Sequence, residues 1–271
     1  MIDFDHIKRT LDGVPRVSQN VIDERREAMT VLLRDRAYLP IGELCKRFQI
    51  SEATARRDLE ALSRQKSIVR TFGGAMADYD RRFAPFAERL KVAAAAKARI
   101  AAAAVRMIEP GMTIFLDAGT TLFTVADQLR KRAIAVQVVT NSLAVAEKLA
   151  HASHVDVDLI GGRLLPNQAV LLGDVTARAA AFYRFDLALL GAEAFDAQGV
   201  WNSAANVVEL QLAVMAQADR HALCLDGRKL GRSGPELLAA WDAVDLLICD
   251  LPLNEASDAG VAMDDEHYVQ A

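Results

Sequence analysis

Apolar runs of strand length alternate with runs of helix length through the last two thirds of this chain. The expected strands span residues 113–116, 136–140, 155–160, 187–190, 222–225 and 246–249, and the expected helices span 121–131, 143–150, 175–182 and 207–218. Strands that are apolar throughout are buried on both faces, which is typical of a parallel sheet with helices on each side. The sequence therefore predicts an α/β domain with a mostly parallel sheet.

Small and polar residues follow five of these strands in succession. They are Asp117-Ala118-Gly119-Thr120-Thr121, Asn141-Ser142, Gly161-Gly162-Arg163, Gly191-Ala192-Glu193 and Asp226-Gly227-Arg228-Lys229. In a parallel sheet such loops meet at one edge, where ligands bind. Because Arg163, Arg228 and Lys229 would supply positive charge there, the pattern predicts a site for an anionic ligand.

The loop at residues 117–121 has the features of a phosphate-binding loop. A buried strand precedes it and a helix follows, an order that directs backbone N–H groups toward a phosphate. Gly119 lets the backbone approach the ligand, and Thr120 and Thr121 offer hydroxyl groups. An alternative stays open, in which a threonine merely caps the helix and Asp117 accepts hydrogen bonds from the loop backbone.

The segment before this domain has the pattern of a helix-turn-helix. Helices are expected at about residues 24–34, 41–48 and 52–64, with Ser51 as a suitable N-cap for the third. In that helix Ala55, Leu59 and Leu62 share one face, which leaves Thr54, Arg56 and Arg57 outward. These three lie in the N-terminal half of the helix, the part that enters the major groove of DNA in this motif.

A small hairpin is expected after the third helix. Residues 68–70 are β-forming or basic, and Gly73-Gly74 follows them, which is typical of the wing of a winged helix. Arg70 would then contact backbone phosphate. The competing interpretation is a protein-interaction module in which Arg56 and Arg57 form a solvated face paired with Asp58 and Glu60.

Charge is unevenly distributed along the chain. The net charge is -4, yet residues 24–75 contain eleven Lys and Arg against seven Asp and Glu. A basic module on an acidic body indicates that only the N-terminal part meets a polyanion. We expect a leader at 1–22, a DNA-binding domain at 23–76, a linker at 77–92 and an α/β domain at 93–271.

Several protein classes fit this sequence poorly. No apolar run has the roughly 20 residues of a membrane span, and the charged N-terminus does not fit a signal peptide. The three cysteines lack paired or metal-like spacing, so reduced thiols in the cytoplasm are expected. His151 and His154 would need further metal ligands, which the nearby sequence lacks. We predict no metal site and no cofactor.

Motifs in both parts resemble the DeoR family of bacterial transcriptional regulators, from about residue 24 to 250. The N-terminal motifs are Ile50-Ser51-Glu52-Ala53-Thr54-Ala55-Arg56-Arg57-Asp58-Leu59 and Arg70-Thr71-Phe72-Gly73-Gly74-Ala75. The C-terminal motifs are Phe115-Leu116-Asp117-Ala118-Gly119-Thr120-Thr121, Val139-Thr140-Asn141-Ser142-Leu143 and Leu159-Ile160-Gly161-Gly162. Their order along the chain makes the resemblance specific.

The resemblance implies a winged helix-turn-helix domain and a sensor domain similar to sugar-phosphate isomerases and CoA transferases. It implies a homo-oligomeric repressor of a carbohydrate operon, released from operator DNA by a phosphorylated sugar or polyol. The implied DNA contacts are Ser51, Thr54, Arg56, Arg57 and Arg70. The implied effector contacts are Asp117, Gly119, Thr120, Thr121, Asn141, Ser142, Gly161, Gly162, Arg163, Glu193, Arg228 and Lys229.

Two loops depart from the family pattern. The chain has Glu193 where an aspartate is common, and Arg228 where a small polar residue is common. An additional guanidinium favours a more anionic ligand or a second phosphate contact. The alternative function is a sugar-phosphate isomerase, in which Lys229, Glu193 and Asp117 would transfer protons. An isomerase has no use for a basic winged helix, so we predict no enzyme and no catalytic residue.

Overall fold

The N-terminal domain is a winged helix. The computed structural model describes residues 19–35, 39–64, 68–70, 74–77 and 84–271. Its first elements are α2 (Gln19–Asp35), β1 (Leu39–Pro40), α3 (Ile41–Phe48), α4 (Glu52–Arg64), β2 (Ile68–Arg70) and β3 (Gly74–Ala77). The three strands form an antiparallel sheet in the order β1-β3-β2. The expected helices and the wing hairpin are therefore confirmed.

The buried side of α4 is the predicted one. Ala55, Leu59 and Leu62 are buried, and they join a small core with Met29 and Leu33 of α2. The start of α2 corrects the sequence prediction, since the helix begins at Gln19, inside the expected leader. Residues 1–18 lie outside the described part of the chain.

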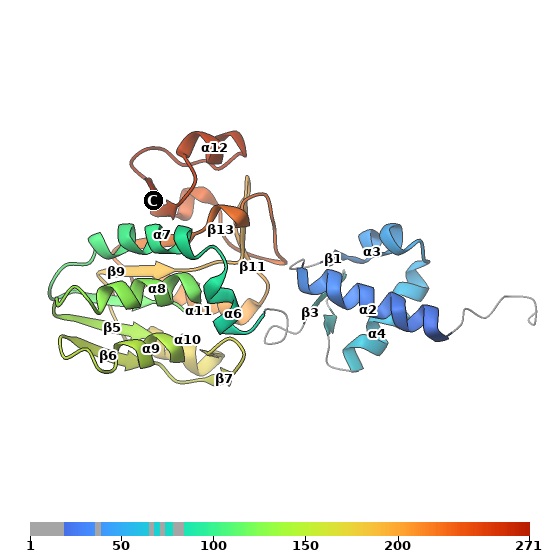
Figure 1. The fold of residues 1–271 in the computed structure, drawn as a ribbon, viewed down its shortest axis with the longest axis horizontal. Coiled ribbons are helices and arrows are strands. Elements are labelled where there is room, and N and C mark those ends of the chain that lie inside the picture. Colours follow the sequence, from blue (N-terminus) through green and yellow to red (C-terminus); the bar gives the residue numbers. More distant parts are fainter. Residues whose placement is uncertain (1–18, 36–38, 65–67, 71–73, 78–83) are drawn as a thin grey trace, which may run out of the picture.

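A seven-stranded parallel sheet forms the centre of the C-terminal domain (Figure 1). Its order is β15-β14-β12-β9-β4-β5-β6, and every pairing is parallel. The strands are β4 (Thr113–Leu116), β5 (Val136–Thr140), β6 (Val155–Leu159), β9 (Leu187–Leu190), β12 (His221–Leu225), β14 (Leu246–Cys249) and β15 (Tyr268–Gln270). All six predicted strands are confirmed, and β15 adds an edge strand.

Helices cover both faces of this sheet. They are α7 (Ala94–Arg106), α8 (Thr120–Leu129), α9 (Leu143–Leu149), α10 (Asp174–Ala180), α11 (Ala205–Met215) and α12 (Leu253–Asp258). One core joins α7, α8 and α9 to strand residues such as Ile114, and the other joins α10 and α11 to residues such as Phe115. Consecutive residues of β4 thus enter opposite cores, as the alternation of side chains along a strand requires.

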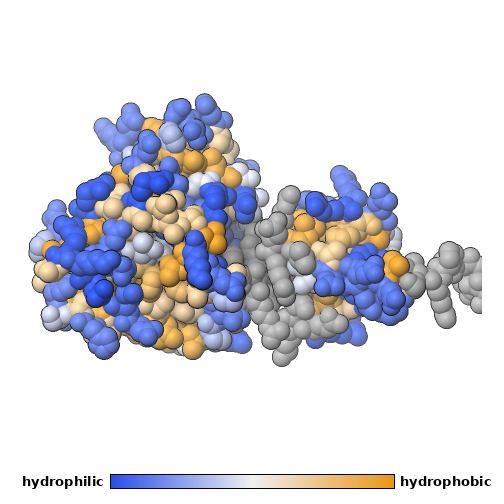
Figure 2. All heavy atoms as spheres, in the orientation of Figure 1, coloured by the Kyte–Doolittle hydropathy of each residue, from blue (hydrophilic) through white to orange (hydrophobic). Residues whose placement is uncertain are grey.

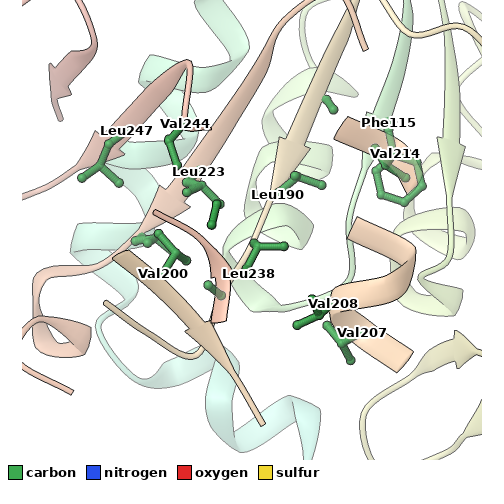
Figure 3. Packing of buried hydrophobic residues seen from close by; sticks show 14 of the residues in the cluster. Phe115, Leu190, Val200, Val207, Val208, Val214, Leu223, Leu238, Val244 and Leu247 are labelled. Carbon is green, nitrogen blue, oxygen red and sulfur yellow. The ribbon is translucent and has the colours of Figure 1, made fainter. Parts of the chain in front are cut away.

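The core beneath α11 is shown in Figure 3. Val207, Val208 and Val214 of α11 lie on the same side as Leu190 and Leu223 of the sheet. Val200 and Leu238 approach from a separate small sheet, which is formed by β10 (Ala194–Asp196), β11 (Gly199–Asn202) and β13 (Glu236–Ala239). This small sheet and the hairpin of β7 (Arg163–Leu165) and β8 (Val170–Leu172) were not predicted.

One further helix corrects the expected linker. Residues 86–91 form α6 (Phe86–Lys91), within the segment 77–92 that we expected to be irregular. Phe86 makes an edge-to-face contact with Phe123 of α8, with ring centroids 5.4 Å apart. The pattern did not reveal α6 because none of its residues is fully buried, so the segment shows little apolar periodicity.

The surface is largely hydrophilic. Figure 2 shows hydrophilic residues over much of the visible face, with hydrophobic residues in smaller patches between them. Among the described helices, none is both long enough and apolar enough to cross a membrane.

Candidate functional site

A cavity of about 240 Å³ opens at the carboxyl edge of the large sheet. Eight of the predicted effector residues line it, namely Asp117, Gly119, Thr120, Thr121, Asn141, Glu193, Arg228 and Lys229. They come from loops after β4, β5, β9 and β12. Those four strands are neighbours in the sheet, which is why residues more than one hundred positions apart share one cavity.

The loop after β4 presents the N-terminus of α8 to this cavity. Gly119 has a φ of 120°, a conformation that residues with a side chain rarely adopt. Within the described chain no side chain caps α8, so neither threonine acts as the capping residue of the alternative interpretation. Thr120 and Thr121 are buried and line the cavity instead. Backbone N–H groups and hydroxyls at this helix start suit an anion.

Asp117 is the centre of a buried hydrogen-bond network. Its Oδ2 accepts hydrogen bonds from Gln211 Nε2 at 2.7 Å and from Gly191 N at 3.2 Å, and its Oδ1 accepts one from Ala118 N at 2.7 Å. Burial raises the pKa of Asp117 to about 6, and the hydrogen bond from Gln211 opposes this rise. Asp117 therefore orders the loop backbone and the cavity floor.

Gln211 and Asn202, which extend this network, were missed in the sequence analysis. Gln211 Oε1 accepts a hydrogen bond from Asn202 Nδ2 at 2.7 Å, and both side chains line the cavity. A signal did exist for Gln211, because it lies four residues after Val207 and three before Val214, on the buried side of α11. A polar side chain at such a position needs buried partners.

Two lysines, the buried Lys97 and the half-buried Lys229, bring positive charge into the cavity. Lys97 Nζ donates to Arg89 O at 2.7 Å, and Lys229 Nζ donates to Ala192 O at 2.5 Å. Burial lowers the pKa of Lys97 to about 8 and also lowers the pKa of Lys229, while the nearby Asp226 carboxylate opposes both shifts. An ammonium group has three donors, so each lysine retains donors for an anionic ligand.

Lys97 and Arg89 line the cavity but were missed in the sequence. Both lie in segments that we interpreted otherwise, Arg89 in the expected linker and Lys97 in an alanine-rich helix. A signal for Lys97 did exist, because it lies beside Ala96 and three residues before Ile100 on the buried side of α7. A lysine is rarely buried without a function or a partner.

Arg228 contributes less free charge than the sequence suggested. Its Nε donates to Asp226 Oδ1 at 2.9 Å, and its side chain is 55% exposed. The other carboxylate oxygen, Asp226 Oδ2, is buried and accepts no hydrogen bond within the described part of the chain, and the same holds for Asn141 Oδ1. These two oxygens can accept hydrogen bonds from the hydroxyl groups of a ligand.

The remaining predicted effector residues do not reach this cavity. Ser142 is buried as the N-cap of α9, where its Oγ accepts a hydrogen bond from Val145 N at 3.2 Å. Gly162 and Arg163 line a separate depression, and Gly161 lines neither. The physical reason is sheet order, since β6 is an edge strand two positions from β4. The expected convergence of five loops therefore holds for four of them.

Gly162 has a packing role that predicts a large effect on stability. Its φ is 152°, and a Cβ atom there would lie 2.0 Å from Thr176 Oγ1 and 2.9 Å from Leu172 O. We expect Gly162→Ala to lower the free energy of unfolding of the α/β domain by about 3 kcal/mol, measured by urea denaturation. Gly161→Ala is the matched control, because a Cβ at Gly161 meets nothing within 4 Å. Equal stabilities of the two variants would contradict this role.

The DNA-binding candidates lie where the pattern predicted. Ser51 Oγ accepts a hydrogen bond from Thr54 N at 3.2 Å, which confirms the N-cap of α4. Arg56 and Arg57 are exposed, and Arg56 pairs with Glu52 one turn earlier. Arg70 lies in β2, but its side chain is outside the described residues.

The pairing proposed for a solvated face is not present. Asp58 is buried and pairs with Arg25 at 2.7 Å and Arg26 at 2.9 Å, both on α2. Glu60 pairs with Arg64. Among the described residues Arg57 forms no ion pair, so its guanidinium faces solvent from the N-terminal half of α4.

A winged helix joined to an α/β domain with a cation-rich cavity defines the class of ligand-responsive DNA-binding regulators. Two family models match the chain, the DeoR-like helix-turn-helix domain at residues 25–80 and the DeoR C terminal sensor domain at residues 92–251. The chain belongs to the DeoR family of transcriptional regulators, which confirms the resemblance found in its motifs.

Relatives of known name support this assignment. The chain is 29% identical over 235 residues to the HTH-type transcriptional repressor GlcR of Bacillus subtilis, covering 86% of this chain and 90% of the relative. It is 29% identical over 230 residues to the glycerol-3-phosphate regulon repressor of Escherichia coli, covering 84% and 91%.

The chain also aligns in part with a solved structure. Ribose 5-phosphate isomerase A of Methanocaldococcus jannaschii aligns with 49% of this chain and 53% of its own, at 17% identity and a TM-score of 0.37.

Proposed function

We propose that this protein represses a carbohydrate-catabolism operon and leaves its operator when a phosphorylated sugar or polyol binds in the cavity. The proposal rests on one observation: Lys97, Lys229 and the N-terminus of α8, which no side chain caps within the described chain, line the same cavity. Two ammonium groups and the N–H groups of a helix start together suit a phosphate. Among the described residues, Asn141 Oδ1 and Asp226 Oδ2 accept no hydrogen bond, so both can accept one from a sugar hydroxyl.

The cavity is proposed as a binding site without catalysis. Lys229 donates to a backbone carbonyl, and Asp117 accepts three hydrogen bonds from the loop backbone and Gln211, which suits positioning roles for both side chains. The relatives named above are repressors, one of them of a glycerol-3-phosphate regulon. These points support a regulator over the isomerase alternative.

On the DNA side we propose that Ser51, Thr54, Arg56, Arg57 and Arg70 contact the operator. Arg57 is the strongest candidate for a base contact, because it is exposed near the start of α4 and Arg56 is held by Glu52. We further propose that the protein works in the cytoplasm as a dimer or tetramer, since paired helix-turn-helix domains read paired half-sites.

A thermal-shift screen of phosphorylated and unphosphorylated ligands tests the proposed effector class. We expect glycerol 3-phosphate or a sugar phosphate to raise the Tm of the α/β domain by about 5–10 °C at a concentration 100 times its Kd. Glycerol and the parent sugars serve as controls and are expected to give no shift. If no phosphorylated compound shifts the Tm at millimolar concentration, the hypothesis that this cavity binds a phosphorylated ligand is wrong.

A further inference from the structure

The helix α6 links the winged-helix domain to the cavity. The last described residue of that domain is Ala77 at the end of β3, and α6 begins nine residues later at Phe86. Arg89 of α6 lines the cavity, and so does Val92, which follows the helix. The first helix after the DNA-binding domain therefore supplies part of the proposed effector site.

Among the described residues, α6 buries little apolar surface against the α/β domain. Besides the contact between Phe86 and Phe123, Phe86 N donates to Asn167 O at 3.2 Å. No residue of α6 is fully buried, and Val92 is 45% exposed. Segments with so little buried apolar surface open at low free-energy cost compared with a domain core.

Hydrogen bonds connect the cavity to the start of this segment. Lys97 Nζ donates to Arg89 O at 2.7 Å. The Arg89 guanidinium lies over the Phe86 ring at 5.7 Å, and its Nε donates to Ala84 O at 3.1 Å. These contacts form a continuous chain from Lys97 through Arg89 to Ala84, next to the segment that leads back to the winged helix.

A strained residue marks the bend between α6 and α7. Ala93 has φ and ψ of 52° and 38°, the left-handed conformation, directly before α7. A non-glycine residue in this conformation costs roughly 1 kcal/mol. The bend thus stores strain at the point about which α6 would move relative to α7.

Charge repulsion gives an anionic ligand its influence on α6. Arg89, Arg228 and Lys229 line the same cavity as Lys97. Burial is the largest cause that lowers the pKa of Lys97, these three cations lower it further, and the Asp226 carboxylate acts in the opposite direction. An anion bound among these cations would offset their mutual repulsion and favour the position in which Arg89 lines the cavity.

We propose that Arg89 contacts the anionic group of the effector and that α6 acts as a strap, docking more firmly when the effector is bound. This inference rests on the proposed function of the cavity. In the occupied state the strap restrains the chain that leads to the winged helix, so effector binding changes how freely the DNA-binding domains can meet their half-sites.

Hydrogen exchange of the full chain with inorganic phosphate as the probe tests the strap. We compare the wild type with Arg89→Met and with Lys91→Met, which removes an exposed cation of the same helix that does not line the cavity. Saturating phosphate is expected to slow exchange at residues 120–124 in all three proteins. At residues 86–92 it is expected to slow exchange about tenfold in the wild type and Lys91→Met, but not in Arg89→Met.

The outcomes separate the strap from the proposed function. Slower exchange at 120–124 without any change at 86–92 in the wild type overturns the strap and leaves the anion site intact. Equal protection of 86–92 in Arg89→Met and the wild type also overturns it. Unchanged exchange at 120–124 in the wild type, together with a negative thermal-shift screen, overturns the anion site and the strap with it.

Discussion

Replacing Lys97 by methionine is expected to weaken binding of a phosphorylated effector about 100-fold while making the protein more stable. The affinity falls because a buried ammonium group in the cavity wall is lost, and truncating one partner of a buried charge pair costs roughly 2–5 kcal/mol. Stability rises because burial lowers the pKa of Lys97 to about 8, so the empty protein bears the cost of a buried charge at neutral pH. Isothermal titration calorimetry and thermal unfolding measure the two effects.

The stability gain is limited by the hydrogen bond that Lys97 donates to Arg89 O. Lowering the pKa of Lys97 from 10.5 to about 8 corresponds to a destabilisation of about 3 kcal/mol. Losing the hydrogen bond offsets about 1 kcal/mol of the gain, which leaves a Tm increase of about 5 °C. Arg106→Met is the matched control on the same helix, because Arg106 is exposed and lies outside the cavity. If Lys97→Met binds the phosphorylated effector as tightly as Arg106→Met does, Lys97 does not contribute to the effector site.

The pH dependence provides a second check on this lysine. The cost of burying its charge is fully present below pH 8 and is relieved as pH rises toward the unfolded value of 10.5. The Tm advantage of Lys97→Met should therefore shrink between pH 8 and pH 10. Affinity of the wild type for an anion should fall above pH 8, because Lys97 must then take up a proton to bind it, and this contribution should be missing in Lys97→Met.

Replacing Asp58 by alanine is expected to destabilise the winged helix by about 3 kcal/mol. Asp58 is 2% exposed and binds the guanidinium groups of Arg25 and Arg26, so it fastens α4 to α2. Without the carboxylate, two neighbouring cations remain with no counter-charge from α4. Hydrogen exchange in α2 and α4 of the full chain should become more than 100-fold faster, and operator binding should fall with it.

Glu60→Ala is the control for this prediction. Glu60 lies on the same helix and pairs with Arg64, but both side chains are about half exposed or more, at 49% and 78%. Surface pairs of this kind contribute less than about 1 kcal/mol, so exchange should change little. If both variants behave alike, the contacts of Asp58 with α2 do not hold the domain together.

Much of the architecture could be predicted from the sequence because it follows from periodic burial. The six apolar runs became the strands of the large sheet, and the face of Ala55, Leu59 and Leu62 became the inside of α4. Prediction was poorer where periodicity is short or absent, as in the small sheet, the β7–β8 hairpin and α6. In α2 the range of the helix alone did not show which side is buried: Met29 and Leu33 are buried, whereas Ala28 is exposed.

The sequence predicted the candidate site only in part, because it shows which loops follow strands but not which strands are neighbours in the sheet. Residues after β4, β5, β9 and β12 lie together as expected, but strand order decides which loops are neighbours, and sequence order does not give it. Gly162 therefore looked like a ligand contact and is a packing position beside Thr176. Lys97, Arg89 and Gln211 line the cavity from helices. We looked for the site in the loops after strands, so these three residues were not found.

The wide separation of the cavity residues has a consequence for the newly made protein. The winged helix is complete once Ala77 has been synthesised, whereas the cavity also needs Lys229, about 150 residues later. At 5–20 residues per second, a growing chain carries a finished DNA-binding domain for roughly eight to thirty seconds before the effector cavity can form. During that interval, a nascent chain has a DNA-binding domain but cannot yet bind the proposed effector.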